Sequence, residues 1–381
     1  MKTVKLPAYS KDIAGEVTRQ DERDIVFARK DLFRYFGEDS EQFKAYYQAH
    51  PEHLDFDRRI SQRKPLGADN LVDAPMFAAQ FAFLDDLGLE SMVDGEPAGE
   101  KQKLVPKVAS SKIKAAARLY GADQTRIGPL KQEWTYSHVG CTIGNREGYP
   151  EWGSSIDLSH HTHAIAMGFR MDLDLLASAP YFPTLLATAQ AYALSAWTAV
   201  RLARYIRILG YSARAHHFSN YQLLVVPVAV DCGLGELSRA GYMLTRKFGL
   251  AVRLSIVTTD MPLEHDLPVD IGVQSFCKQC RICAEECPSG AIPSGDKVLH
   301  NGVKKWKLDE EKCYAYWHVN GTDCGVCMAV CPWTKPPTPF HRFTARIASI
   351  KGPHQGWLAW AEREVYGKHK PKPFPEYLQD R

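Results

Sequence analysis

The sequence lacks any apolar run long enough to cross a bilayer, which excludes a membrane-spanning helix. Its N-terminal stretch, MKTVKLPAYSKDIAGEVTRQDERD, contains neither the apolar core of a signal peptide nor a twin-arginine pair. We therefore expect a cytoplasmic protein, or an exported one only if a twin-arginine leader has been removed. The net charge of +3 is small for 381 residues, so we expect no nucleic acid among its partners.

A dinucleotide-binding fingerprint is also missing. The run GLGE begins at Gly233 and comes between an expected strand and an expected helix, but Ser238 occupies the third glycine position of G-x-G-x-x-G. Two glycines in such a turn still let a backbone approach a ligand closely. Gly233, Leu234 and Gly235 are therefore candidate cofactor contacts.

Cysteines are plentiful but unevenly distributed, because eight of the ten fall between Cys277 and Cys331. Disulfides are rare in the cytosol, so clustered thiols indicate metal binding or redox chemistry. The first run has the spacing C-x2-C-x2-C-x3-C-P, and the second also ends in C-x2-C-x3-C-P. This pattern is typical of two 4Fe–4S clusters, in which the fourth cysteine of each run binds the other cluster.

The spacing assigns four ligands to each cluster. Zinc modules usually show two separated C-x2-C pairs, which explains these runs poorly. The long gap between Cys313 and Cys324 makes Cys313 the least regular ligand. One cluster would use Cys277, Cys280, Cys283 and Cys331, and the other would use Cys287, Cys313, Cys324 and Cys327.

The rest of the chain alternates helices and apolar strands, which predicts an α/β layer ahead of the cysteine runs. Residues 1–109 are polar and loop-rich and are expected to pack on a core of residues 110–270, followed by a ferredoxin-like segment (271–337) and a tail (338–381). Within the core we expect helices at 110–121, 183–210 and 238–249, and strands at 163–172, 221–231 and 251–260.

Several segments resemble the cobalamin-dependent reductive dehalogenases, both in their residues and in their order along the chain. They are FARKDLF, IKAAARLYGAD, LARYIRILGYSARAH, DCGLGELSRAGYMLTRKFGLAVRLSIVTTDMPL, DIGVQSFCKQCRICAEECPSGAI and CGVCMAVCPW, which together extend over most of residues 20–340. The resemblance implies a nitroreductase-like α/β core that binds cobalamin, with the two 4Fe–4S clusters supplying electrons. It also implies removal of halide from a small organohalide. The chain lacks the reductase extension of some members, so an external ferredoxin, flavodoxin or reductase is the expected electron donor.

The resemblance also implies a catalytic tyrosine, an arginine, and a lysine or asparagine. Tyr192 matches the tyrosine and shares a helical face with Ala196, Ala199 and Ala203, although an aromatic on such a stripe can simply fill the core. Arg253 lies on the opposite strand face from Val252, Leu254 and Ile256, where it either faces a pocket or extends into solvent. Asn220 matches the third position, although its residue type is equally common in turns.

The cobalamin is expected to be base-off, because no D-x-H-x-x-G motif supplies a histidine to cobalt. His217 is a candidate cofactor contact, Trp134, Tyr136 and Trp152 are candidate cavity walls, and the remaining histidines more simply line surfaces. Two alternatives remain open. One is an epoxyqueuosine reductase-like enzyme that acts on tRNA, and the other is an electron carrier that uses the ferredoxin-like segment alone.

Overall fold

A four-stranded antiparallel sheet forms the centre of the molecule in the computed structural model, which describes residues 2–68, 74–141 and 147–379. The strands occur in the order β2–β3–β7–β4, with bounds Gln124–Pro129, His163–Arg170, Val252–Thr259 and Ala213–His216. β3 and β7 pair along their whole length, from His163 opposite Thr259 to Arg170 opposite Val252. The predicted strands at 163–172 and 251–260 are confirmed.

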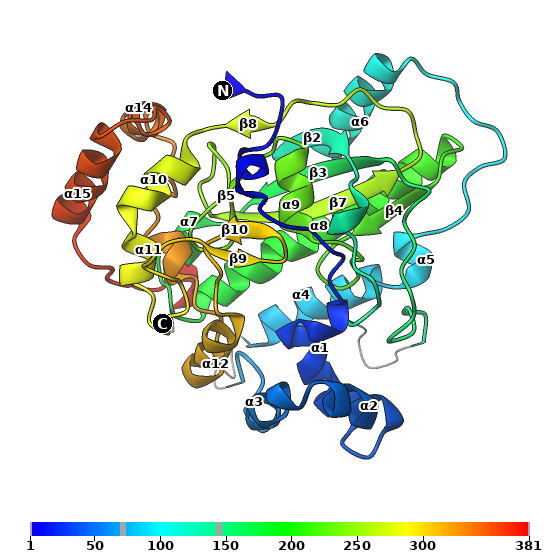
Figure 1. Cartoon of the computed structure of the whole chain (residues 1–381), viewed down its shortest axis with the longest axis horizontal. Coiled ribbons are helices and arrows are strands. Elements are labelled where there is room, and N and C mark those ends of the chain that lie inside the picture. Colours follow the sequence, from blue (N-terminus) through cyan, green and yellow to red (C-terminus); the bar gives the residue numbers. More distant parts are fainter. Residues whose placement is uncertain (1, 69–73, 142–146, 380–381) are drawn as a thin grey trace.

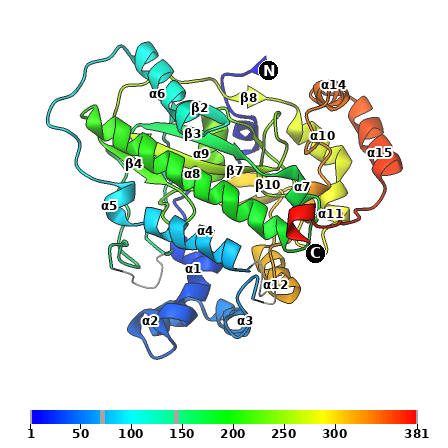
Figure 2. The ribbon, with the colours of Figure 1, turned by 180° about the vertical axis from the view of Figure 1, so that it is seen from behind.

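Helices cover both faces of this sheet (Figures 1 and 2). The long helix α8 (Pro183–Ile208) lies along one face, as Figure 2 shows, and α4 (Ala74–Leu87) and α6 (Pro106–Tyr120) pack against α8. The opposite face contacts α9 (Val225–Asp231). The expected α/β core is therefore present, and the predicted helices at 110–121 and 183–210 are confirmed.

The alternation of β7 decides which side chains reach α8. Val257 belongs to the same buried core as Ile206 of α8, whereas Val252 and Ile256 pack in the core that includes α9. Arg253 and Val257 are four positions apart in the strand and therefore point to the same face, so the Arg253 side chain starts on the α8 face. The small residues Ala196, Ala199 and Ala203 are fully buried, and their short side chains let α8 lie close to the sheet.

The N-terminal region is largely helical, so the expectation of a loop-rich segment is wrong. Its helices begin at good local signals: the Ser40 hydroxyl accepts a hydrogen bond from the Phe43 amide, and Pro51 occupies the first turn of the next helix. The helices are α1 (Val26–Asp31), a π-helical turn (Leu32–Phe36), α2 (Glu41–Ala49), α3 (Pro51–Ser61), α4, and α5 (Glu90–Val93).

Two predicted elements have the wrong type. Residues 225–231 form α9 instead of a strand, because Pro227 is its third residue and the first-turn amides of a helix need no intrahelical partner. Residues 238–249 form turns around the short strand β6 (Met243–Leu244), which pairs with β5 (Glu236–Leu237). Gly241 and Gly249 have φ of 80° and 59°, values that interrupt a right-handed helix.

The cysteine-rich segment and the C-terminal helices lie together at one end of the molecule (Figure 1). The short strand β1 (Lys2–Thr3) reaches this side and pairs with β8 (Val269–Asp270). In the described ranges no helix has the length and apolarity needed to cross a bilayer. The remaining elements are α10 (Val273–Cys280), α11 (Ile282–Glu285), the hairpin β9 (Val298–His300) and β10 (Val303–Lys305), α12 (Glu310–Asn320), α13 (Val326–Ala329), α14 (Pro339–Ala348) and α15 (His354–Tyr366).

Candidate active site

A cavity of about 540 Å³ opens between α8, the start of β7, the segment leading into α9 and the β9–β10 hairpin. Its size is within the range of small-molecule and cofactor sites. Most of its wall is aromatic or aliphatic, and polar groups enter from the hairpin side, including Asn301, Lys305 and Lys307. A wall of this kind suits a flat, largely apolar ligand that has polar groups at its edge.

Tyr192 and Arg253 meet in this cavity. Tyr192 projects from α8 and Arg253 from β7, and the guanidinium carbon lies 5.0 Å from the centroid of the tyrosine ring. Phe218 covers another side of the ring at a centroid distance of 4.6 Å. The structure therefore brings together the phenol and the cation that the sequence singled out.

Arg253 is held from two directions. Its Nη2 donates a hydrogen bond to Thr188 Oγ1 at 2.9 Å, and Nη1 lies 3.7 Å from the sulfur of Met328. Thr188 in turn donates to Asp323 Oδ2 at 2.6 Å, and both of these residues are buried. Asp323 and Met328 belong to the loop and helix that contain Cys324 and Cys327, so the cysteine-rich segment directly supports the arginine.

Asn220 is buried elsewhere and does not line the cavity. Its Oδ1 accepts a hydrogen bond from Arg214 Nη2 at 2.9 Å, and its Nδ2 donates to Gly88 O at 2.9 Å and to Glu90 Oε2 at 3.3 Å. These bonds hold the turn that follows β4, and the neighbouring Phe218 occupies the place beside Tyr192. The structure thus does not bring Asn220 to the Tyr192–Arg253 pair.

His217 lines the cavity. Its Nε2 lies 3.1 Å from the Leu87 carbonyl oxygen, so Nε2 carries the proton and Nδ1 is an acceptor, with no partner in the described part of the chain. Burial lowers the pKa of His217 to about 4, so the ring is neutral near pH 7. His217 therefore contributes a neutral ring to the cavity wall, with its Nδ1 atom buried.

The glycine run does not reach the cavity. A Cβ on Gly233 would lie 2.4 Å from Leu267 O, and one on Gly235 would lie 2.3 Å from Leu244 O, so both glycines permit close packing of protein backbone. Leu234 is buried in the core around α9. The run follows a helix and precedes a strand, the reverse of the expected order, which explains why Gly233, Leu234 and Gly235 face the protein interior.

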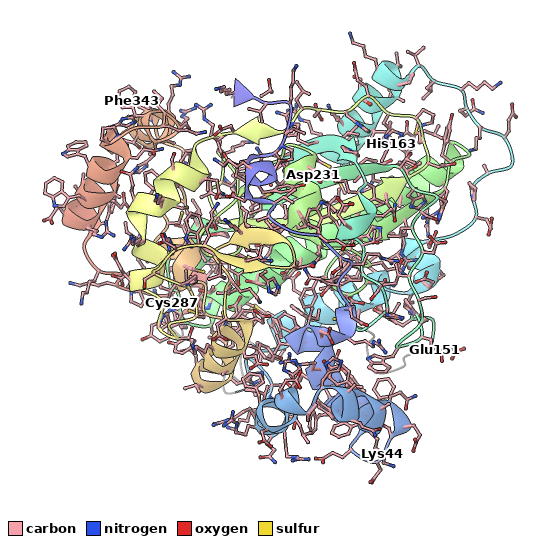
Figure 3. All side chains as sticks on the ribbon, in the orientation of Figure 1. Lys44, Glu151, His163, Asp231, Cys287 and Phe343 are labelled. Atoms are coloured by element: carbon pink, nitrogen blue, oxygen red, sulfur yellow. The ribbon has the colours of Figure 1, made fainter. Side chains whose placement is uncertain are left out.

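Two of the three candidate wall residues line the cavity. Trp134 and Tyr136 do so, and the Trp134 indole donates a hydrogen bond to Asp231 Oδ2 at 2.9 Å, near the Asp231 label in Figure 3. Trp152 instead packs with Phe36 and Tyr46 of the N-terminal helices. Sequence reasoning missed the cavity residue Tyr242, because it fell within a segment predicted to be a helix.

The first group of cysteines surrounds its own small cavity, lined by Cys277, Cys280, Cys283 and Cys331. Arg239 is buried against this group: its Nε donates a hydrogen bond to Cys277 O at 3.0 Å, and its Nη1 donates to Pro293 O at 2.8 Å. A buried arginine is costly unless a negative group lies close by. An anionic iron–sulfur cluster bound by these thiols would supply that charge, so the residues present fit such a cluster.

The second group of cysteines has neighbours in both the first group and the large cavity, since Cys327 lies near Cys331 and near the cavity residue Tyr242. Burial and then the neighbouring thiols Cys324 and Cys287 raise the pKa of Cys313 to about 12. The pKa of Cys327 is raised by burial and then by Cys324, Cys313 and Cys287, which shows that the four sulfurs are neighbours. Cys287 comes from the first run, and Figure 3 shows it at the α11 end of the molecule.

Tyr242 connects this second group to the large cavity. Its side chain lines the cavity, and Cys313 and Cys327 are near enough to act on its hydroxyl. Burial and then Cys313 and Cys327 raise the pKa of Tyr242 well above its ordinary value, and the charges of Arg253 and Tyr192 also act on it. One tyrosine therefore lies near the cysteine group and lines the cavity that also contains Tyr192.

The cysteine segment matches a family model described as a 4Fe–4S dicluster domain over residues 276–335. The chain is also 31% identical over 322 residues to a tetrachloroethene reductive dehalogenase of Dehalobacter restrictus, covering 74% of this chain and 57% of that protein. It is 35% identical over 258 residues to the tetrachloroethene reductive dehalogenase of Sulfurospirillum multivorans, covering 60% and 51% of the two chains. The chain belongs to the reductive dehalogenase family.

A solved structure supports this placement in the reductive dehalogenase family. A catabolic reductive dehalogenase superposes with a TM-score of 0.76 at 27% identity, covering 97% of this chain and 49% of that one. The chain thus spans about half the length of the relatives it matches. The mixed α/β core followed by a ferredoxin-like segment with two 4Fe–4S clusters is confirmed.

Proposed function

We propose that this protein removes halide from an organohalide, using cobalamin bound in the large cavity and electrons delivered through the two 4Fe–4S clusters. The observation that supports this most is that Tyr192, Arg253 and Tyr242 all line one cavity, and that Tyr242 lies near Cys313 and Cys327 of the nearer cluster. One solved relative is described in terms of B12-dependent dehalogenation, which agrees with this proposal.

The cavity residues fit a corrinoid in chemical character. The aromatic and aliphatic wall suits the face of a macrocycle, while Asn301 and Lys305 suit the amide side chains at its edge. When bound, cobalamin supplies a strongly reducing cobalt centre for cleavage of the carbon–halogen bond. The protein contributes orientation, a proton and a favourable place for an anion.

Replacing halogen by hydrogen consumes two electrons and one proton and releases one halide ion. We assign the proton to the Tyr192 hydroxyl, since it is the acidic group of the Tyr192–Arg253 pair. Arg253 lies over the phenol ring, where its positive charge stabilises a phenolate and attracts the departing halide. Thr188 and Asp323 keep the guanidinium in this position.

The arrangement of the two cysteine groups supports an order in which electrons pass through the clusters. We propose that the Cys277, Cys280, Cys283 and Cys331 cluster is the outer one and that the cluster of Cys287, Cys313, Cys324 and Cys327 is the inner one. Tyr242 lies near the inner group and lines the cavity, and Cys331 of the outer group is close enough to raise the pKa of Cys327 in the inner group. Burial raises the pKa of both Cys277 and Cys324 to about 11, so these thiols carry protons near pH 7. Iron binding displaces those protons.

Anaerobic reconstitution tests the proposal. The protein would be loaded with iron, sulfide and cobalamin, reduced with titanium(III) citrate, and screened for halide release from aryl and alkyl halides. We expect corrinoid to stay bound through gel filtration and halide to appear with at least one class of substrate. Bound corrinoid with turnover of epoxyqueuosine-containing tRNA and no halide release would contradict the proposal, as would clusters that load while no corrinoid is retained.

A further inference from the structure

The outer cysteine group lies directly below a hollow on the protein surface. The hollow is lined by Lys278, Gln279, Arg281, Glu285 and Arg363. Arg281 also lines the small cavity of Cys277, Cys280, Cys283 and Cys331. Arg281 therefore lies between the surface hollow and the space that these four cysteines line.

Arg281 has an unusual backbone conformation, with φ of 58° and ψ of 0° in the left-handed region. The second cysteine run has Gly325 at the equivalent place, directly after the first cysteine of its C-x2-C, and its φ and ψ are 64° and −4°. Side chains with a Cβ disfavour this region, whereas glycine enters it freely. The chain thus uses glycine at the inner position and an arginine at the outer one, where a cation reaches the surface.

The hollow has an excess of positive charge. Arg363 pairs with Glu285 and also donates a hydrogen bond to Cys280 O, but Lys278 and Arg281 form no ion pair with any described carboxylate. Trp360 of α15 is 54% exposed and precedes Arg363 by three positions, so it stands on the same side of that helix. Unpaired cations beside an exposed tryptophan are typical of a surface that binds an acidic protein.

We propose that this hollow is the docking site of a small acidic one-electron carrier protein, which reduces the cluster bound by Cys277, Cys280, Cys283 and Cys331. Docking would bring the carrier's redox centre over Arg281, which lines both the hollow and the cysteine cavity. One electron then passes from the reduced carrier, which is oxidised, to the outer cluster, which is reduced. This inference rests on the proposed function for what the electrons reduce after they leave the clusters. The entry of electrons at the outer cluster does not depend on that function.

Lys278→Glu is the first test, because Lys278 is exposed and its side chain lines the hollow without lining the cysteine cavity. The probe carrier is an acidic plant-type 2Fe–2S ferredoxin, kept reduced by NADPH and its reductase, and the readout is anaerobic stopped-flow bleaching of the 4Fe–4S clusters. We expect the second-order rate to fall about tenfold at low ionic strength and the difference to shrink at high salt. Reduction by titanium(III) citrate in the same variant serves as the internal reference.

Two further variants sharpen the test. Lys107→Glu makes the same charge change at an exposed lysine on α6, at the opposite end of the molecule (Figure 1), and should leave the carrier rate at the wild-type value. Arg281→Gly removes the cation while suiting the left-handed backbone, so it should slow reduction by the carrier without lowering the melting temperature.

The outcomes separate docking from catalysis. If Lys278→Glu and Arg281→Gly are reduced by the carrier as fast as the wild type, or if Lys107→Glu slows equally, the docking site is refuted. Because cluster bleaching is measured without an organohalide, a failure of halide release leaves this result intact. Slow reduction by the carrier in the first two variants alone would establish the site even if the substrate remains unknown.

Discussion

Thr188 and Arg253 are joined by a hydrogen bond of 2.9 Å in which the threonine hydroxyl accepts from the guanidinium. The same hydroxyl donates to Asp323 at 2.6 Å, one residue before Cys324. Since a hydroxyl has one proton, donation to Asp323 fixes its orientation and leaves its lone pairs for Arg253. The cysteine-rich segment thereby sets the position of the cation beside Tyr192.

Thr188→Val should therefore impair turnover while preserving the shape of α8. Valine removes the acceptor for Arg253 and leaves Asp323 without its donor, so we expect kcat for halide release to fall about ten- to hundredfold, with a smaller change in KM. Stability should drop by about 1–3 kcal/mol, because a buried carboxylate loses its partner. Steady-state kinetics and urea denaturation would measure these two effects.

Thr198→Val is the matched control for that variant. Thr198 is buried on the same helix and donates to Tyr120 O at 3.0 Å, away from the cavity. It should lose stability and keep its kcat. Equal kcat values for Thr188→Val and Thr198→Val would rule out a positioning role for Thr188.

Tyr192→Phe should abolish halide release if the phenol is the proton donor. Loss of a positioned acid typically lowers the rate by about 10²–10⁴-fold. Arg253 retains its contact with the aromatic ring, so iron, sulfide and corrinoid contents should match the wild type. Tyr205→Phe, on the same helix but outside the cavity wall, is the control. Substantial turnover by Tyr192→Phe would assign the proton to another group.

The parts of the site that could be predicted from the sequence depend on local periodicity and spacing. Alternation along β7 predicted that Arg253 lies on the other face of this strand from Val252 and Ile256. The unbroken helix-forming segment from Pro183 placed Tyr192 on α8. Cysteine spacing carries direct geometric information about a cluster. These features depend on neighbours within a few positions in the chain.

Non-local contacts explain most of what was missed. Asn220 is held by Arg214, Gly88 and Glu90, and two of these residues are more than a hundred positions away. The link from Thr188 to Asp323 also joins distant segments. The segment around Pro227 was predicted to be an edge strand, but the first turn of a helix tolerates a missing amide equally well. The sequence pattern alone could not choose between them.

Asn220→Ala tests whether this residue acts in the chemistry or in the fold. Because Asn220 is buried and bonded to three partners, we expect a loss of about 2–3 kcal/mol in unfolding free energy. The kcat per folded, cofactor-loaded molecule should fall far less than in Tyr192→Phe. Wild-type stability combined with a Tyr192→Phe-like loss of kcat would restore Asn220 to a direct catalytic role.

Buried histidines should make the fold sensitive to mild acid. Burial lowers the pKa of His161 to about 4, and His161 bonds to Thr258 and Ser212 in its neutral form. The unfolded state therefore binds a proton below about pH 6.5 that the folded state refuses until about pH 4, so stability is complete above this window and falls as the pH drops through it.

His161→Asn should flatten this pH dependence. Removing one such proton reduces the slope of unfolding free energy by up to ~1.4 kcal/mol per pH unit within the window. His160→Asn is the control, because His160 is exposed and adjacent in sequence. Urea denaturation across the window would measure both slopes, and identical slopes for the two variants would contradict the assignment.

Paired substitutions can test whether the last cysteine of the first run binds the cluster of the second run. Cys287 lies in the first run but neighbours Cys324 and Cys313 of the second. If Cys287 serves the inner cluster, Cys287→Ser combined with Cys324→Ser damages one cluster only and should leave about four iron atoms per chain. Cys287→Ser combined with Cys280→Ser damages both clusters and should leave almost none. Iron and acid-labile sulfide analysis after anaerobic reconstitution distinguishes the two cases. The reverse result, with iron retained in the Cys280 pair and lost in the Cys324 pair, would show that each run builds its own cluster.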